Sequence, residues 1–142
     1  MDILCGWKLD PVLNIFRIPI RIINPITQDS VIRHCLFDTG FSGYAGLSKE
    51  TITSLKLERV GRGKGVTVSG IIDYNNYIAM IEIVDQEEKT VASIVNKDYG
   101  KELENKSLIP VQEFGIPILG IKAIIQFSWL IESEIQAILL MK

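Results

Sequence analysis

Strand-like alternation of apolar and polar residues dominates the first two thirds of the chain. Residues 13–23 alternate in their central part, and the pair Asn24-Pro25 ends this run at a turn. Residues 31–37 form a second β-rich run. Together the two runs predict an antiparallel hairpin with its turn at residues 27–30.

A short helix and a loop follow in the pattern. Residues 48–57 predict a helix, because Ser48 is a suitable N-cap and Ile52 and Leu55 share one face. The glycine-rich basic stretch 59–65 predicts a surface loop. It lacks the Gly-Lys-Thr/Ser ending after a strand that a phosphate-binding loop requires.

The next segments predict further sheet. Two β-rich runs, 66–70 and 77–84, are joined by the more polar residues 71–76, which predicts a second hairpin with its turn in that segment. Residues 90–95 continue the sheet. Residues 96–107 are a charged stretch that we expect to be exposed to solvent.

The C-terminal third contains two apolar segments. Residues 116–120 predict a buried strand that ends in glycine. The apolar tail, residues 135–141, needs a surface to cover it, either as the interface strand of a dimer or as an edge or core strand within the monomer. Because no internal repeat interrupts this order, residues 1–142 predict a single, mainly β domain with one or two short helices.

Composition narrows the classes of partner. The 142 residues include 15 basic and 17 acidic side chains, a net charge of −2, so no strong field attracts nucleic acid or an anionic membrane. The most apolar window, residues 116–131, is shorter than the roughly 20 residues of a membrane span. The N-terminal residues lack the basic start and long apolar core of a secretory signal. We therefore expect a cytoplasmic protein that binds neither nucleic acid nor membrane.

The two cysteines predict reduced thiols and no metal site. Cys5 and Cys35 lack the close spacing that zinc sites use, and Cys35 lies within an apolar run. We interpret Cys35 as a small buried hydrophobic residue. No metal ion or other cofactor is expected.

One short segment carries candidate chemistry. Residues 36–40 read Leu-Phe-Asp-Thr-Gly, so an apolar strand runs directly into an aspartate, a small hydroxyl residue and a glycine. Such a sequence delivers one carboxylate at the floor of a tight loop, although Asp and Gly also end strands in ordinary turns. About 80 residues later, Pro117-Ile118-Leu119-Gly120 again places two apolar residues before a glycine.

The order of these two motifs resembles that of the retropepsin-like (clan AA) aspartic proteases, the single-domain relatives of pepsin, and especially their small prokaryotic and archaeal members. The resemblance covers residues 13–142. It implies a closed retropepsin-like β-barrel and a homodimeric aspartic endopeptidase in which the two aspartate loops face each other. The partners it implies are a second copy of the chain and a polypeptide substrate.

The resemblance also implies roles for individual residues. Asp38 would be the catalytic carboxylate, Thr39 would lock its loop against the symmetry-related loop, and Gly40 would allow close backbone approach. Leu119 and Gly120 would pack beneath the loop.

A flap is the remaining part of the site that the resemblance implies. The hairpin around residues 70–76 would close over an extended peptide, with Gly70, Ile71 and Ile72 as substrate-binding residues.

The chemistry of this class requires two aspartates. Two carboxylates held about 3 Å apart share one proton, because both cannot ionise comfortably. The ionised member takes a proton from a water molecule, which attacks the scissile carbonyl while the protonated member stabilises the developing oxyanion. The chain has one Asp-Thr-Gly, so a monomer would be inactive.

The chain departs from the family pattern at two places, and the first of them, Phe41, motivates an alternative. Phe41 follows Gly40 where the family usually has a small residue, and Ser42 and Ile121 replace the acid and the arginine that form an ion pair in retroviral members. Because both partners are absent together, no charge is left unpaired. The alternative is a catalytically weak or inactive retropepsin-like module for peptide binding or dimerisation.

Two further interpretations fit the pattern less well. A phosphoryl-transfer enzyme with Asp38 as nucleophile would need alternating strands and long helices together with further acidic metal ligands, and the β-rich order offers neither. His34 is the single histidine, and a catalytic triad would need a nucleophile and an orienting acid that the pattern does not supply. We expect an ordinary strand histidine.

Overall fold

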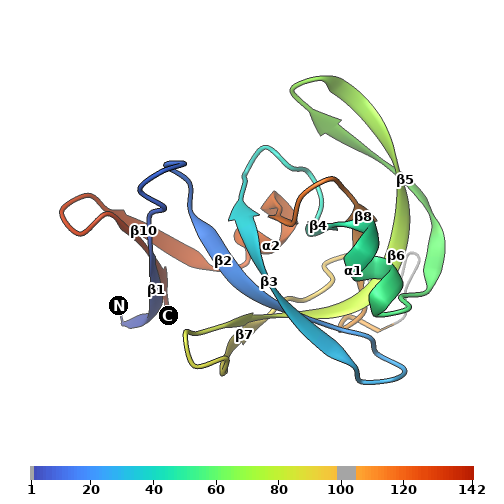
Figure 1. The fold of residues 1–142 in the computed structure, drawn as a ribbon, viewed down its shortest axis with the longest axis horizontal. Coiled ribbons are helices and arrows are strands. Elements are labelled where there is room, and N and C mark those ends of the chain that lie inside the picture. The colour runs from blue at the N-terminus through green and yellow to red at the C-terminus, as the bar shows by residue number, and fades with distance from the viewer. Residues whose placement is uncertain (1, 99–104) are drawn as a thin grey trace.

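A computed structural model describes residues 2–98 and 105–142, and it confirms a mainly β fold with two short helices. Figure 1 shows a large curved sheet, a projecting hairpin on one side, and a small sheet with both termini on the other. The elements are β1 (Ile3–Lys8), β2 (Arg17–Ile23), β3 (Ser30–Phe37), β4 (Ala45–Leu47), α1 (Lys49–Ser54), β5 (Arg59–Thr67), β6 (Gly70–Val84), β7 (Thr90–Ser93), β8 (Ile109–Glu113), β9 (Ile118–Leu119), α2 (Ile121–Ile124), β10 (Ser128–Glu132) and β11 (Ala137–Met141).

The large sheet forms a ring of strands. Its order is β2-β3-β9-β4-β8-β6-β5, with β7 on β6, and β2 also pairs with β6. Alternate residues of β2 and β6, among them Ile20 and Ile83, point inward and are fully buried. This ring encloses the main hydrophobic core, which is the largest source of stability in such a fold.

The first predicted hairpin is present as β2 and β3, with different ends. Its first strand begins at Arg17, because Asp10 binds the backbone amides of Val12 and Leu13 and thereby holds the preceding residues in a loop. The turn begins earlier than predicted. The side chain of Asn24 is buried, accepts backbone hydrogen bonds from the turn and donates to Leu55 O (2.8 Å).

The helices are short and positioned by their caps. Ser48 caps α1 as predicted, since its Oγ accepts a hydrogen bond from Thr51 N (3.2 Å). The helix ends before the predicted limit, because Leu55 is its C-cap and Lys56 adopts a positive φ of 52°. Among the described residues, no helix is long and apolar enough to cross a bilayer.

The second hairpin differs from the prediction. Residues 59–65, predicted as a loop, form most of β5, and residues 71–76, predicted as a turn, lie inside the long strand β6. The turn is at Val68-Ser69, followed by Gly70 with a φ of +114°. Strands are poor in glycine, so local propensity indicated a loop, but pairing with residues 70–77 of β6 overrides this preference.

The apolar tail is a core strand of the monomer. β11 lies between β1 and β10 in a three-stranded antiparallel sheet, and Ile138 and Leu140 on it are fully buried. Both edges of β11 are therefore occupied by strands of the same chain. The interpretation of the tail as a strand that pairs with a second subunit is wrong.

The segments before the C-terminal sheet are shorter than predicted. The strand predicted at residues 116–120 has only the two buried residues of β9. The strand predicted at residues 90–95 has only the four residues of β7. Within the charged stretch 96–107, residues 99–104 lie outside the described residues. Asn96 is buried and not solvent-exposed, because its side chain bonds to Tyr44 and Leu108.

Both cysteines are free thiols, and Cys35 is fully buried as predicted. Burial raises the pKa of Cys35 from 9.0 to about 12 and also raises that of half-buried Cys5. Since only the thiolate is nucleophilic, we expect iodoacetamide at pH 8 to modify Cys5 slowly and Cys35 only after denaturation. Mass spectrometry of the alkylated protein checks this. Rapid modification of native Cys35 would contradict the buried position.

The same shift predicts how stability changes with pH. The Cys35 thiol of the unfolded chain loses its proton near pH 9.0, whereas the folded chain holds it to about pH 12. The folded state therefore binds more protons in this window, and the contribution of Cys35 to the free energy of unfolding falls as the pH rises through it.

Candidate active site

The Asp-Thr-Gly segment forms a tight loop at the end of β3. Asp38 is half-buried, and its backbone amide donates to Leu119 O (3.1 Å). Its Oδ1 accepts a hydrogen bond from Gly40 N (2.8 Å), and Phe41 N donates to Asp38 O (3.2 Å). The hydrogen bond from Gly40 N orients the carboxylate from within its own loop, and the backbone bonds hold the loop in place.

The segment Leu119-Gly120 lies directly against this loop. β9 pairs in parallel with β3, where Phe37 is opposite Leu119, and antiparallel with β4, where Ala45 is opposite the same residue. Gly120 has no room for a side chain: a Cβ there would collide with Gly43 O and lie 2.9 Å from Phe41 O. The structure therefore brings Leu119 and Gly120 into contact with the loop that carries Asp38.

Backbone amides at the start of α2 hold the far side of the loop. Gly120 N donates to Tyr44 O (2.9 Å), Ile121 N to Phe41 O (2.9 Å) and Lys122 N to Gly43 O (3.2 Å). In retroviral members an ion pair joins the positions that correspond to Ser42 and Ile121. Here main-chain hydrogen bonds between residues 120–122 and residues 41–44 connect the same two segments.

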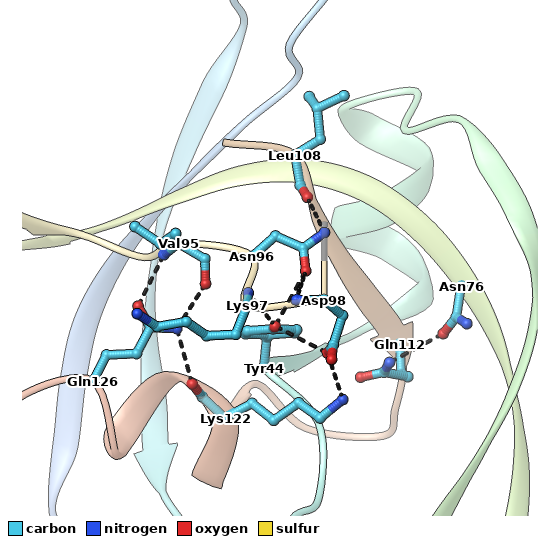
Figure 2. A network of polar contacts seen from close by, with 10 residues as sticks. All are labelled: Tyr44, Asn76, Val95, Asn96, Lys97, Asp98, Leu108, Gln112, Lys122 and Gln126. Atoms are coloured by element: carbon cyan, nitrogen blue, oxygen red, sulfur yellow. Dashed lines mark hydrogen bonds and ion pairs between the residues drawn. The ribbon is translucent and has the colours of Figure 1, made fainter. Parts of the chain in front are cut away.

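A polar network behind the loop was not predicted from the sequence (Figure 2). The hydroxyl of Tyr44 accepts a hydrogen bond from Lys97 N (2.8 Å) and lies 3.2 Å from both Asn96 Oδ1 and Asp98 Oδ2. Lys122 Nζ lies 2.9 Å from Asp98 Oδ2. Burial is the main cause that raises the pKa of Tyr44.

The network extends along α2. Gln126 accepts from Val95 N (2.9 Å) and donates to Val95 O (2.7 Å) and Lys122 O (2.9 Å). The residues that follow β7 are thereby bonded to the helix that holds the aspartate loop. Nothing in the local sequence predicted this network, because Asn96 begins a charged stretch that was expected to be exposed.

The other predicted site residues take different positions. Thr39 is exposed and makes no hydrogen bond to any described residue. Ile71 is 74% exposed, and Gly70 lies at the hairpin turn. Ile72 alone of the three predicted flap residues packs against the cluster around the aspartate loop.

Phe41 is buried in an aromatic cluster. It is 3% exposed, and its ring centroid lies 5.9 Å from that of Tyr74 on β6 and 5.5 Å from that of Phe114 after β8. Ile118 on β9 completes this buried group. The cluster joins the aspartate loop to the base of the β5–β6 hairpin. Tyr74 and Phe114 were not identified from the sequence.

The hairpin also contacts the loop directly. Val66 N on β5 donates to Ser42 Oγ (3.3 Å), four residues after Asp38 in the chain. The hairpin therefore lies against the aspartate loop in this structure.

Truncation of Phe41 should reduce stability. Phe41→Ala removes a buried ring, and such a change typically lowers the free energy of unfolding by about 3–5 kcal/mol. Val12→Ala, which truncates an exposed side chain, should change it by less than about 0.5 kcal/mol. Urea unfolding followed by tryptophan fluorescence checks both. Equal stabilities of the two variants would contradict the packing of Phe41.

The described residues supply one carboxylate at this site. Within residues 2–98 and 105–142, no group of three or more His, Cys, Asp or Glu side chains is placed to hold a metal ion. His34 is exposed and lines a different pocket with Trp7 and Arg17. The chemistry that the described residues offer at this loop is therefore that of a single oriented carboxylate.

Comparisons with known proteins do not identify a family. No protein-family model matches the chain, and no curated protein matches it at a significant level.

Proposed function

We propose that the protein is a homodimeric, retropepsin-like aspartic endopeptidase that hydrolyses peptide bonds with Asp38 of both subunits. The observation that carries this proposal is the aspartate loop, in which Asp38 ends β3, receives a hydrogen bond from Gly40 N and donates its own amide to Leu119 O. The ring of strands in the large sheet supports the finer assignment to a closed acid-protease barrel.

The mechanism follows from pairing two such loops. When the two Asp38 carboxylates lie about 3 Å apart, one proton is shared between them. The ionised carboxylate removes a proton from a water molecule, and the water oxygen attacks the carbonyl carbon of the scissile bond. The protonated carboxylate donates a hydrogen bond to the developing oxyanion and then a proton toward the leaving amine.

Exposure of the loop supports a dimer. Thr39 and Gly40 are exposed at its tip, which leaves the Thr39 hydroxyl accessible to a second loop. Ile125 is 74% exposed at the C-cap of α2, the helix whose first amides bond to residues 41–44, so an apolar side chain is available on that helix. Burial of such a side chain between subunits would favour association.

The β5–β6 hairpin supports a polypeptide substrate. Gly63 and Gly65 on β5 lie opposite Tyr74 and Ile72 on β6, so the face of the hairpin that turns toward the aromatic cluster carries few side chains on β5. Such a face leaves room for an extended peptide backbone.

We infer a cytoplasmic location from the two free thiols.

A cleavage assay tests the proposal. We expect the protein to cleave an unfolded, alkylated polypeptide at acidic to neutral pH, and a transition-state peptide analogue to inhibit the cleavage. Mass spectrometry of the fragments measures both. Absence of cleavage, or cleavage that the analogue does not affect, would contradict the assignment.

A second candidate is a catalytically weak or inactive peptide-binding or dimerisation module. The observations that favour it are the packing of Phe41 against the base of the hairpin and the hydrogen bond from Val66 N to Ser42 Oγ. Both contacts hold the hairpin against the aspartate loop. Peptide binding without any turnover is the result that would support this candidate over the enzyme.

A further inference from the structure

A pocket of about 460 Å³ lies beside the base of the β5–β6 hairpin. Three segments that are distant in the sequence line it: the cap and first residues of α1, the first part of β6, and the end of β8 with the residues that follow. Tyr74 and Phe114 line the pocket and also contact Phe41, which follows the Asp-Thr-Gly segment. These two rings therefore connect the pocket to the aspartate loop.

Acidic side chains predominate among the charged residues of this pocket. Glu50 from α1, Asp73 from β6 and Glu113 from β8 line it, with Lys49 as the single cation in the lining, so three negative and one positive charge give a net −2. Lys64 lies opposite Asp73 across the β5–β6 ladder. None of the three carboxylates makes an ion pair or side-chain hydrogen bond to another described residue. They are therefore available to a cation from outside.

The rest of the wall is apolar and contains an unsatisfied polar atom. Ile72, Tyr74 and Phe114 supply aliphatic and aromatic surface. Tyr74 is 7% exposed, and its hydroxyl is buried without a hydrogen-bond partner among the described residues. An unpaired buried hydroxyl costs free energy unless a ligand pairs with it.

These features match the chemistry of a long basic side chain. The methylene groups of lysine or arginine pack on apolar surface while the charged end reaches carboxylates. An ammonium or guanidinium group is also attracted to the faces of aromatic rings. A neutral side chain of the same length would use the apolar wall only, and an acidic one would be repelled.

We propose that this pocket binds a lysine or arginine side chain of the polypeptide substrate and so gives the enzyme a preference for basic residues near the scissile bond. The inference rests on the proposed function, because it takes the substrate to be a polypeptide that the protein cleaves. Tyr74 and Phe114 of the pocket wall pack on Phe41, three residues after Asp38, and we therefore assign the bound side chain to the same extended segment that reaches Asp38.

The test measures binding separately from cleavage. The Asp38→Asn protein is titrated into fluorescein-labelled decapeptides that carry lysine, norleucine or glutamate at each position in turn. At one position of the decapeptide, we expect the lysine peptide to bind about five- to tenfold more tightly than the norleucine peptide, and the glutamate peptide to bind most weakly. The preference should shrink as sodium chloride is raised from 50 to 500 mM, because salt screens exposed charges.

Matched variants assign the preference to the pocket. In the Asp38→Asn background, Glu113→Gln should reduce the preference for lysine to less than about twofold, and Glu50→Gln should reduce it in part. Glu134→Gln removes an exposed carboxylate between β10 and β11 and should leave it unchanged. Equal binding of the lysine and norleucine peptides, or no binding of either, overturns the inference.

Cleavage by the protein with Asp38 intact separates this inference from the proposed function. Asp38-dependent cleavage without any preference for basic residues would overturn the pocket assignment and leave the endopeptidase assignment in place. A lysine preference in binding, lost in Glu113→Gln, with no cleavage by the unsubstituted protein would support the pocket and overturn the endopeptidase assignment.

Discussion

Asp38→Asn should lower kcat/KM for peptide cleavage by about 10³-fold or more, because asparagine can neither share the proton of the pair nor take one from water. The change is nearly isosteric, and an amide oxygen can still accept the hydrogen bond from Gly40 N. We therefore expect the free energy of unfolding to change little. Initial rates on a fluorogenic peptide and urea unfolding curves measure the two quantities.

Asp29→Asn is the matched control for this experiment. Asp29 is an exposed residue at the β2–β3 turn, and its replacement removes the same charge at a different place. It should retain the rate of the unsubstituted protein within about twofold. If Asp38→Asn also retained the rate, Asp38 would not be the catalytic acid and base, and the proposed function would be wrong.

Gly120→Ala should have a large effect on both stability and cleavage. The added Cβ would collide with Gly43 O and lie 2.6 Å from Phe41 Cδ2 and 2.9 Å from Phe41 O. Two of these neighbours are backbone atoms of the aspartate loop, which cannot move aside without displacing Asp38. We expect the free energy of unfolding to fall by about 2–3 kcal/mol and cleavage to be strongly reduced.

Gly115→Ala provides the same chemical change without the collision. A Cβ at Gly115 would meet no atom within 4 Å, and this residue lies only five positions earlier in the chain. Its stability should stay within about 0.5 kcal/mol of the unsubstituted protein. Equal destabilisation by the two substitutions in urea unfolding would show that close packing at Gly120 is not the cause.

The parts of the fold that local patterns determine were predictable. Apolar-polar alternation identified β2 and β3, and the side chain of Ser48 identified the start of α1. The aspartate loop was identified because strand residues run directly into Asp38-Thr39-Gly40. Contact between this loop and Leu119-Gly120, expected from the family resemblance alone, is present in the structure.

Features that depend on distant partners were not predictable in the same way. The glycines of residues 59–65 argue for a loop locally, and only pairing with β6 makes them a strand. The tail could not be assigned to a subunit interface or to the core until β1 and β10 were seen on its two edges. The sequence showed that Phe41 follows Gly40 where the family usually has a small residue. Its aromatic neighbours Tyr74 and Phe114 were not predictable, because they come from separate elements of the fold.

The stoichiometry of a tight transition-state peptide analogue tests the central claim most directly. If two Asp38 loops form one site, isothermal titration calorimetry of the unsubstituted protein should give one analogue bound per two chains. The Asp38→Asn protein should bind the analogue at least about a hundredfold more weakly. One analogue bound per chain, or equal binding by the Asp38→Asn protein, would contradict a catalytic site shared between two subunits.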